Sequence, residues 1–218
     1  MIVERMIGRT EGRFGLPLFG KRMFDIAGSA ILLAALAAPL TFLALLVALD
    51  ARTTPIFRQQ RIGWRGKPFY IYKLRTMRNG IPPGEHSGSA EVPFLHVPRN
   101  DPRVTRLGRF LRRYSIDELP QLVNVLLGQM SLVGPRPFDV GDFEQGPFPY
   151  PGYEEWVSKR HSTRPGITGL WQVSGRNSTS FSELIELDLK YVTGWTPGIE
   201  FSIICRTLAA AVGGKGCS

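Results

Sequence analysis

Cysteine is almost absent from this sequence, which has only Cys205 and Cys217 in 218 residues. Two isolated cysteines form neither a disulfide framework nor a metal-ligand pattern, and their scarcity suits a reducing compartment. The three histidines, His86, His96 and His161, are scattered without metal-ligand spacing, and neither cysteine lies beside a histidine in a nucleophile signature. The sequence therefore gives no support to a disulfide-stapled secreted domain or to a cysteine nucleophile.

Acidic residues are also scarce: 18 aspartates and glutamates stand against 27 lysines and arginines, giving a formal charge of +9 and a pI of about 10.0. A charge of this sign predicts a polyanionic partner. Nucleic acid, an anionic membrane surface and a nucleotide-bearing substrate all satisfy it, and charge alone does not choose among them. The length suits one domain of ordinary size, and no internal repeat is visible.

Charge is absent altogether from Ile26 to Leu49. As a helix this run reaches about 36 Å, which is enough to cross a hydrocarbon core. The run starts too late and is too long for the apolar region of a signal peptide, and no convincing cleavage site follows it. It therefore predicts a membrane helix.

Two features of this run favour a re-entrant hairpin over a straight transmembrane anchor. Basic residues prefer the cytoplasmic side of a membrane, and both flanks are equally basic. Arg5, Arg9, Arg13, Lys21 and Arg22 precede the run, and Arg52, Arg58, Arg61, Arg65 and Lys67 follow it. Pro39, near the middle, removes a backbone hydrogen bond and kinks or breaks the helix. A hairpin that enters and leaves by the cytoplasmic leaflet satisfies both observations, provided that neighbouring groups repair the broken turn.

The remaining pattern predicts an α+β fold that is predominantly helical, with a small β-hairpin. Residues 56–60 and 69–73 are expected to be strands on either side of the turn signal 63–66. Helices are expected over 119–127, over 180–192 behind a capping box of Ser180 and Glu183, and over 198–212. The Gly-, Pro- and Ser-rich stretch 79–100 is interpreted as a mobile lid or a disordered loop, and a second irregular stretch ends near Pro151.

A basic amphipathic helix is expected to begin at Asp101-Pro102, with the aspartate as N-cap and the proline at the first helical position. Its apolar side carries Val104, Leu107, Phe110, Leu111 and Tyr114, and its other side carries Arg103, Arg106, Arg109, Arg112 and Arg113. So many arginines favour a helix in the headgroup region, with its apolar face in the acyl boundary. The alternative is an ordinary surface helix packed on a core.

The strongest chemical signal is the adjacent pair Asp117 and Glu118, just before Pro120. A carboxylate can attack a phosphoryl group and form an acyl phosphate, or it can hold a metal. Two adjacent carboxylates stay ionised only near cations, which Arg112, Arg113, Arg136 or Mg²⁺ can supply. The alternative is a capping box of Ser115 and Glu118, but Pro120 would then lie inside the helix, where its missing N–H costs a hydrogen bond.

Other candidate residues follow from their immediate context. Lys73 and Arg75 are expected on one face of the second strand, which suits phosphate binding or a charged edge strand. Arg136, between two prolines, offers a rigid guanidinium for phosphoryl oxygens. Asp188 shares a helix face with apolar residues, so it needs a partner, whether arginine, metal or substrate.

Several motifs in a fixed order resemble the bacterial sugar transferase family, the small monotopic polyprenol-phosphate phosphoglycosyl transferases. They are Lys21-Arg22-Met23-Phe24-Asp25, Tyr72-Lys73-Leu74-Arg75-Thr76-Met77, Asp117-Glu118, Gly134-Pro135-Arg136-Pro137, Arg164-Pro165-Gly166-Ile167-Thr168-Gly169 and Gly175-Arg176-Asn177. The resemblance implies a re-entrant membrane helix with a break at Pro39. Family members often have Ser-Pro at that break; here Ala38 cannot bond back to the freed backbone, which leaves Thr41 or neighbouring helices to do so.

The resemblance also implies a reaction and a set of residue roles. A phosphosugar passes from a nucleoside diphosphate sugar, expected to be a UDP-sugar, to polyprenyl (undecaprenyl) phosphate through an aspartyl intermediate, with release of UMP, as the first step of lipid-linked glycan assembly. Asp117 is then the nucleophile and lies at Mg²⁺, with Glu118 as its catalytic partner. The residues expected to bind substrate or phosphate are Lys73, Arg75, Arg112, Arg136, Arg164, Arg176 and Asp188.

The expected organisation is a basic extension over 1–20, a re-entrant helix over 21–54 and a catalytic domain over 55–218, like the small form of the family. The expected location is the cytoplasmic face of the bacterial inner membrane, among lipids rather than with nucleic acid, and a homodimer is left open. Two other readings use the same residues: a Mg²⁺-dependent membrane phosphohydrolase, and a basic membrane scaffold without catalysis. The scaffold gives no reason for the Asp117–Glu118 pair.

Overall fold

The computed structural model describes residues 18–78, 101–139, 152–175 and 180–214. Four parts of the chain discussed above lie outside these residues: the stretch 79–100 interpreted as a lid or loop, most of the second irregular stretch, Arg176, and nearly all of the basic extension. The elements in chain order are α2 (Leu18–Ala51), β1 (Ile56–Ile62), the 3₁₀ turn η1 (Trp64–Gly66), β2 (Pro68–Leu74), α3 (Arg106–Arg113), η2 (Ile116–Glu118), α4 (Gln121–Leu126), β3 (Ser131–Val133), β4 (Phe138–Asp139), α6 (Tyr153–Arg160), β5 (Gly166–Thr168), α7 (Leu170–Ser174), α8 (Phe181–Thr193) and α9 (Pro197–Val212).

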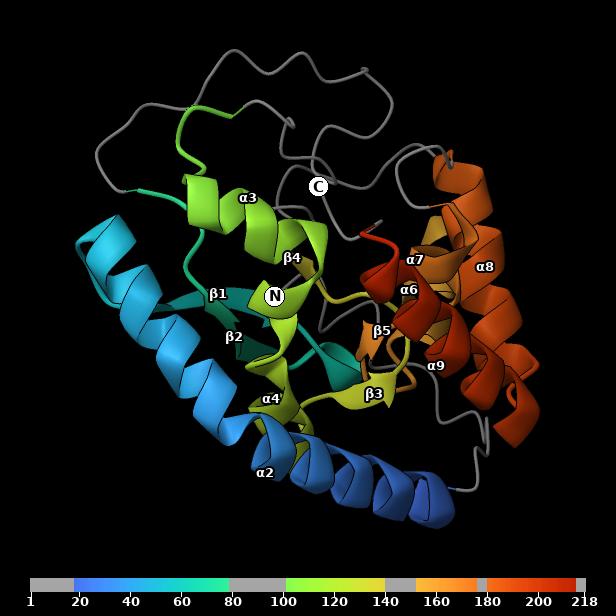
Figure 1. The fold of residues 1–218 in the computed structure, drawn as a ribbon. Coiled ribbons are helices and arrows are strands. Elements are labelled where there is room, and N and C mark those ends of the chain that lie inside the picture. The colour runs from blue at the N-terminus through green and yellow to red at the C-terminus, as the bar shows by residue number, and fades with distance from the viewer. Residues whose placement is uncertain (1–17, 79–100, 140–151, 176–179, 215–218) are drawn as a thin grey trace.

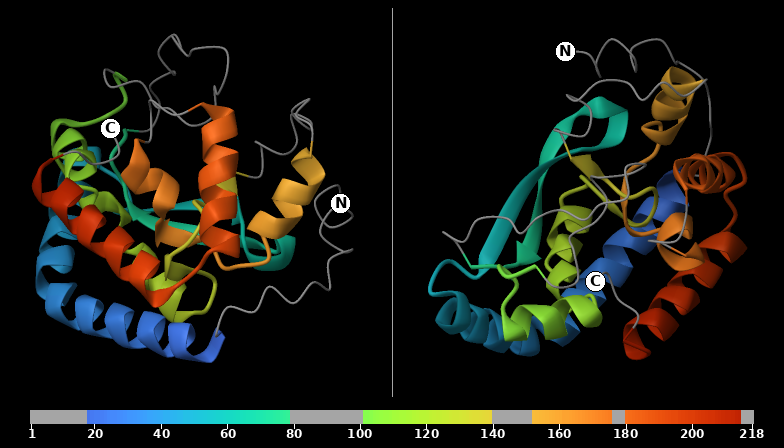
Figure 2. Two further views of the ribbon diagram at one scale, coloured as in Figure 1. Left: turned by 90° about the vertical axis from the view of Figure 1, so that its right-hand side faces the viewer. Right: turned by 90° about the horizontal axis from the view of Figure 1, so that it is seen from above.

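The mostly helical α+β fold with a small hairpin is confirmed. Strands β1 and β2 pair antiparallel from Ile56↔Leu74 to Ile62↔Pro68, and β4 adds to the other edge of β1. Strands β3 and β5 form a separate parallel pair. Helices α6 to α9 pack on one side of this centre and α2 runs along the outside of the body (Figures 1 and 2). The sequence did not indicate β3, β4, β5, α6 or α7, which are short and depend on distant partners.

Helix α2 is one continuous helix through Pro39, bent near its middle (Figure 1). Pro39 cannot donate to the carbonyl of Ala35, four residues back. The hydroxyl of Thr41 donates to the carbonyl of Ala37 at 2.8 Å, so it does not replace the missing bond at Ala35. Proline and hydroxyl back-bonding both bend helices, and the predicted break is therefore a bend within one helix.

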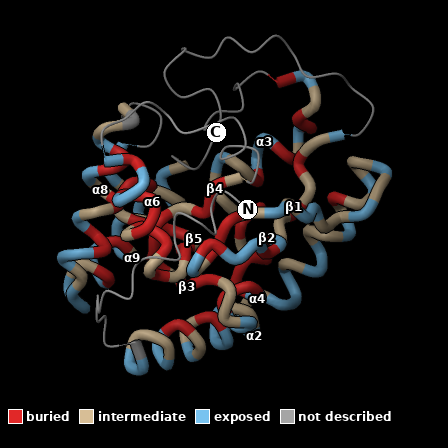
Figure 3. Tube along the Cα trace, turned by 180° about the vertical axis from the view of Figure 1, so that it is seen from behind, coloured by how far each residue is buried: buried red, intermediate tan, exposed pale blue. Residues whose placement is uncertain are grey.

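Both halves of α2 contact the same body. In the first half, the buried carboxylate of Asp25 accepts from the Ser131 hydroxyl at 2.8 Å and the Leu132 amide at 3.0 Å. In the second half, Val47 packs in one cluster with Leu74 and Leu111. Buried residues line the side of α2 that faces the body, and exposed residues line its outer side (Figure 3).

The free edge of β2 is covered by a side chain of α4. The amide oxygen of Asn124 accepts from the backbone N–H of Tyr72 at 3.1 Å, and its amide nitrogen donates to the Tyr70 carbonyl at 2.7 Å. Asn124 thus takes the place of a neighbouring strand and satisfies backbone groups at an otherwise open sheet edge. This contact fixes α4 against β2 and hence Glu118 against Lys73.

The predicted start of the basic helix at Asp101 is wrong. The Asp101 carboxylate pairs with the Arg103 guanidinium at 2.6 Å, and Val104 forms a β-bridge with Met77. Thr105 is the N-cap instead, and its hydroxyl accepts from the Gly108 amide at 2.8 Å. A local ion pair thus competes successfully with the Asp-Pro capping signal.

Most of the apolar side of α3 faces the protein core. Leu111 is fully buried and Leu107 packs beside it against α2 and β2, whereas Phe110 is half exposed. The alternative of a surface helix packed on a core therefore describes Leu107 and Leu111. Placement of the arginine-rich side and Phe110 at a membrane stays a prediction.

At Gly108, α3 lies directly against the backbone of Thr76, just beyond the end of β2. A Cβ at this position would lie 2.2 Å from the Thr76 carbonyl oxygen, which is backbone and cannot rotate away. We expect Gly108→Ala to destabilise the protein by about 1–3 kcal/mol, measured by denaturant unfolding in detergent. Gly20→Ala in α2, with nothing within 4 Å of the added carbon, is the control and should be neutral or stabilising. Equal stability of the two variants would contradict the close packing of α3.

Candidate active site

The acidic pair lies on the 3₁₀ turn η2, and both carboxylates are buried. Leu119 N–H donates to the Ile116 carbonyl at 3.2 Å, the carbonyl to which an α-helical residue 120 would donate. Since Pro120 has no N–H, the tight turn uses a carbonyl that proline leaves open. Ser115, in the left-handed region at φ 56°, makes no side-chain capping bond. The capping-box alternative for Glu118 is therefore not formed.

Glu118 lies between two cations. Its Oε1 atom is 2.7 Å from the Lys73 ammonium and 3.5 Å from the Arg136 guanidinium. Lys73 comes from β2 and Arg136 from the segment between β3 and β4, so three distant parts of the sequence meet at one carboxylate. The Lys73 ammonium donates a hydrogen bond to this carboxylate, and Arg136 adds a second ion pair.

Asp117 is held differently. Its Oδ1 atom is buried and has no hydrogen-bond partner among the residues that the structure describes. Burial, followed by repulsion from Glu118, raises the pKa of Asp117 to about 6, while Lys73 and Arg112 act in the opposite direction. A buried carboxylate oxygen without a partner is costly to the folded state, which makes Asp117 a candidate functional residue. With a pKa of about 6, Asp117 is mostly ionised at pH 7 and can attack phosphorus or bind a metal.

Arg112 reaches the acidic pair from α3. Its Nε donates to the Thr76 hydroxyl at 2.8 Å, which ties the guanidinium to the end of β2. Burial lowers the pKa of Arg112, while Asp117 and Asp101 raise it. Arg112 therefore adds a third positive charge near the acidic pair, and both Lys73 and Arg112 lower the pKa of Asp117.

The partner of Asp188 is an arginine, one of the three possibilities left open by the sequence. Its carboxylate accepts from Arg160 Nε at 2.6 Å, and both side chains are buried. Arg160 also donates to the backbone carbonyl of Arg136 and lies 3.8 Å above the ring of Phe138. The buried ion pair between α6 and α8 thus holds the segment that carries Arg136. Direct contact of Asp188 with substrate stays a prediction.

Two of the predicted phosphate-binding arginines are engaged elsewhere. Arg75 donates to the carbonyl and the hydroxyl of Thr54 at 2.8 and 3.2 Å. Arg164 donates to the Gly128 carbonyl at 2.8 Å, beyond the end of α4 opposite to Asp117, and lies 4.4 Å above the Trp64 ring. These contacts give both arginines structural roles, and binding of phosphate by either residue stays a prediction. Arg176 lies outside the described residues.

Sequence reasoning missed three positioning residues: Thr76, Asn124 and Arg160. Thr76 lies within the family motif at residues 72–77, and that motif was the signal that could have identified it. Arg160 follows Lys159 in the last turn of α6, where two basic residues are typical of a solvated helix end. The burial of Arg160 depends on its contact with Asp188 of α8, and no pattern in the sequence around residue 160 indicates that contact.

Mg²⁺ fits the site only as an ion that takes most of its ligands from substrate and water. Among the described residues no cluster of three or more His, Cys, Asp or Glu side chains occurs. Glu118 is already engaged by Lys73 and Arg136, so the Asp117 oxygen without a partner is the available ligand. Mg²⁺ is commonly bound by one or two carboxylates together with substrate phosphates, and the residues present satisfy that minimum.

Fold and site together define a mostly helical α+β protein. One long apolar helix packs along the rest of the protein, which contains a buried pair of carboxylates with basic side chains beside it. Within the described residues, Phe19–Ala51 is long and apolar enough to cross a membrane. The chain belongs to the bacterial sugar transferase family, since the sequence model of that family matches residues 16–214.

Curated proteins are similar over most of the chain. This chain is 38% identical over 196 residues to the uncharacterized sugar transferase EpsL of Bacillus subtilis (strain 168), and the match covers 90% of this chain and 89% of EpsL. It is 39% identical to the galactosyl transferase CpsE of Streptococcus agalactiae serotype III (strain NEM316), covering 91% of this chain and 43% of CpsE. It is 41% identical to the UDP-glucose:undecaprenyl-phosphate glucose-1-phosphate transferase of Caulobacter vibrioides (strain ATCC 19089 / CIP 103742 / CB 15), covering 86% of this chain and 68% of that protein. The chain thus spans less than half the length of some relatives.

The raised pKa of Asp117 leads to a prediction about pH. If ionised Asp117 is required, kcat/KM should fall about tenfold per pH unit below about pH 6. Glu118→Gln removes a negative neighbour, so this acid limb should move to lower pH; Lys73→Met removes a positive neighbour and should move it to higher pH. Rate profiles between pH 4.5 and 8 measure both shifts. Movement of both limbs in the same direction would contradict the assignment.

Proposed function

We propose that this protein transfers a phosphosugar from a nucleoside diphosphate sugar, a UDP-sugar, to undecaprenyl phosphate through an aspartyl intermediate. The observation that carries the proposal is the buried Asp117 oxygen without a described partner. Lys73 and Arg112 act on this carboxylate, and Lys73 and Arg136 pair with its neighbour Glu118. The names of the relatives support the substrate classes, since one is a UDP-glucose:undecaprenyl-phosphate glucose-1-phosphate transferase. Relatives named for glucose and for galactose leave the sugar open.

In the first step, Asp117 Oδ1 attacks the sugar-linked phosphorus of the donor. The bond from this phosphorus to the bridging oxygen breaks, and UMP leaves with the electron pair. In the second step, an oxygen of the lipid phosphate attacks the same phosphorus and the bond to Asp117 breaks. This step regenerates the carboxylate and forms a sugar-linked polyprenyl diphosphate.

The surrounding cations lower the charge barrier to this attack. A carboxylate and a diphosphate repel each other, so Arg112, Lys73 and Arg136 are proposed to offset the negative charge that gathers around phosphorus. Glu118 holds Lys73 and Arg136 in place. Mg²⁺ bound at Asp117 would supply charge neutralisation to the diphosphate.

We further propose that α2 is re-entrant and that its two ends lie on the cytoplasmic face of the bacterial inner membrane. Contacts of Asp25 and Val47, in opposite halves of α2, with one body support this arrangement, because a straight span would carry one half away from that body. The basic flanks on both sides support it as well.

Labelling of single cysteines tests this topology. In a background in which Cys205 and Cys217 are serine, Phe19→Cys and Arg52→Cys place one thiol near each end of α2, both at exposed positions. An impermeant maleimide should label both from the cytoplasmic side of sealed vesicles and neither from the periplasmic side. Lys67→Cys, exposed on the body, is the control. Labelling of the two ends from opposite sides would establish a transmembrane span instead.

Release of UMP from a panel of UDP-sugars tests the reaction. The full chain in detergent is assayed with and without Mg²⁺ and undecaprenyl phosphate. Sustained release that needs both additions, with formation of a sugar-linked lipid, is the expected result. Sustained release without the lipid would identify a phosphohydrolase, and no release from any donor would favour the scaffold.

A further inference from the structure

The residue that follows α2 has an unusual backbone conformation. Arg52 lies in the left-handed region at φ 51°, directly after the last helical residue, Ala51. This position at a helix end is usually glycine, because a Cβ makes the conformation costly. Arg52 is also exposed, so its side chain gains no burial in return. Glycine would therefore suit the backbone at this position better than arginine does.

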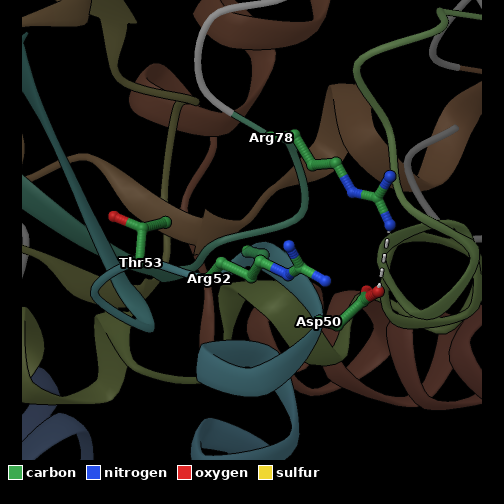
Figure 4. A pocket seen from close by; sticks show the side chains of 5 residues that line it. Asp50, Arg52, Thr53 and Arg78 are labelled. Carbon is green, nitrogen blue, oxygen red and sulfur yellow. Dashed lines mark ion pairs between the residues drawn. The ribbon is translucent and has the colours of Figure 1, made fainter.

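A pocket of about 530 Å³ lies beside this residue. Its described lining consists of Asp50, Ala51, Arg52, Thr53 and Arg78. Figure 4 shows the guanidinium groups of Arg52 and Arg78 extending toward the same side, near the Asp50 carboxylate. Arg78 and Asp50 form an ion pair at 3.7 Å, whereas Arg52 has no ion pair or side-chain hydrogen bond to any residue that the structure describes.

The pocket lies where apolar surface gives way to charge. Leu45 and Leu49, in the last two turns of α2, are 61% and 77% exposed, and Asp50 and Arg52 follow at once. If α2 lies in the bilayer, as proposed above, this boundary is at the height of the lipid headgroups. Guanidinium groups at that height meet phosphate, to which they donate charge-assisted hydrogen bonds.

We propose that Arg52 and Arg78 form a binding site for the phosphate of an anionic lipid headgroup. The site is separate from the acidic pair, and it rests on the membrane placement of α2 but not on the transfer chemistry. Asp50 orients Arg78 through their ion pair, which leaves the Arg52 guanidinium as the principal ligand.

A bound headgroup would also fix the height of the catalytic residues. Arg78 N–H donates to the Arg103 carbonyl at 2.9 Å, and Thr105 N–H donates to the Thr76 carbonyl at 3.0 Å. Thr76 in turn holds Arg112. The segment from Thr76 to Arg78 therefore connects the lipid site to α3 and to the cation beside Asp117.

The test uses the full chain in micelles of a neutral detergent, doped with fluorescent phosphatidylglycerol. Arg52→Gly and Arg78→Gln should each weaken lipid binding about fivefold, the factor expected for one basic residue near an anionic surface. Arg52→Gly should not lower the melting temperature, since glycine suits the native φ. A loss of binding without a loss of stability therefore separates the proposal from misfolding.

Arg65→Gly is the matched control. Arg65 is exposed, has φ 56° and lies in the turn between β1 and β2, so the substitution removes the same charge and relieves the same conformation away from α2. Binding by Arg65→Gly should equal that of the parent, and Asp117→Asn should also bind normally, whatever its activity. Equal binding by Arg52→Gly, Arg65→Gly and the parent would overturn the proposal. Displacement of the lipid by an equal concentration of inorganic phosphate would also overturn the proposal, because the site would then bind free phosphate as well as it binds the lipid headgroup.

Discussion

Asp117→Asn is expected to lower the rate of UMP release by at least about 10³-fold, because an amide cannot attack phosphorus. The parent, given donor and Mg²⁺ but no lipid acceptor, should release at most one UMP per active site in a rapid burst and retain the phosphosugar. The variant should show no burst. The measurement is single-turnover release with a donor labelled in the sugar, followed by mass analysis of the intact protein.

Asp117→Asn is not expected to unfold the protein. The pKa of Asp117 is raised in the folded protein from 3.8 to about 6, so folding favours the protonated form, and stability falls as the pH rises through this window. Above it, asparagine removes an ionised group that burial and Glu118 disfavour, so Asp117→Asn should melt at or above the temperature of the parent. Glu155→Gln removes an exposed carboxylate and should release UMP normally. A full burst in Asp117→Asn would reassign the nucleophile, with Glu118 the first candidate.

Arg160→Met is expected to destabilise the protein by about 3–5 kcal/mol, since it leaves Asp188 buried without its cation. Adding Asp188→Leu should restore most of this stability, because two apolar side chains can replace a buried ion pair. Denaturant unfolding of the parent, both single variants and the double variant measures the coupling. Lys159→Met, beside Arg160 in sequence but in a surface pair with Glu155, is the control and should change stability little.

The double variant also separates stability from catalysis. Arg160 donates to the carbonyl of Arg136, and that contact is lost even where stability returns. If the ion pair positions Arg136, kcat should stay reduced in the stable double variant, and the KM for the donor should change less than kcat. Full recovery of kcat together with stability would show that Arg160 and Asp188 contribute to folding alone.

Elements whose signals are local followed the sequence closely. The hairpin at residues 56–74 has alternating strand residues and glycine at its turn, and it formed with the expected pairing. The capping box of Ser180 and Glu183 starts α8 as predicted, and α9 runs over nearly the expected residues. The acidic pair Asp117 and Glu118 was also recognisable as a candidate site from local sequence. Pro120, only a few residues further on, makes the competing capping box of Ser115 and Glu118 unfavourable.

Elements that depend on distant partners did not follow in this way. Strands β3 and β5 are three residues each and lie 35 positions apart from Ser131 to Gly166, so neither has a pattern of its own. Asp101 has a capping signal, yet its carboxylate binds Arg103 and the helix starts at Arg106. Equal local patterns can end in different contacts, as Lys73 reaches Glu118 while Arg75 reaches Thr54.

The sequence by itself determined that the chain contains a long apolar helix with basic flanks, that a proline bends this helix, and that two adjacent carboxylates are candidates for phosphate chemistry. These features rest on composition and on spacing within a few residues. The tertiary structure alone decided which cations surround which carboxylate, that Asn124 closes the edge of β2, and that a buried arginine from α6 holds Arg136. The reason is physical: hydrogen bonds and ion pairs form within about 3–4 Å, and only packing brings residues from distant parts of the chain that close.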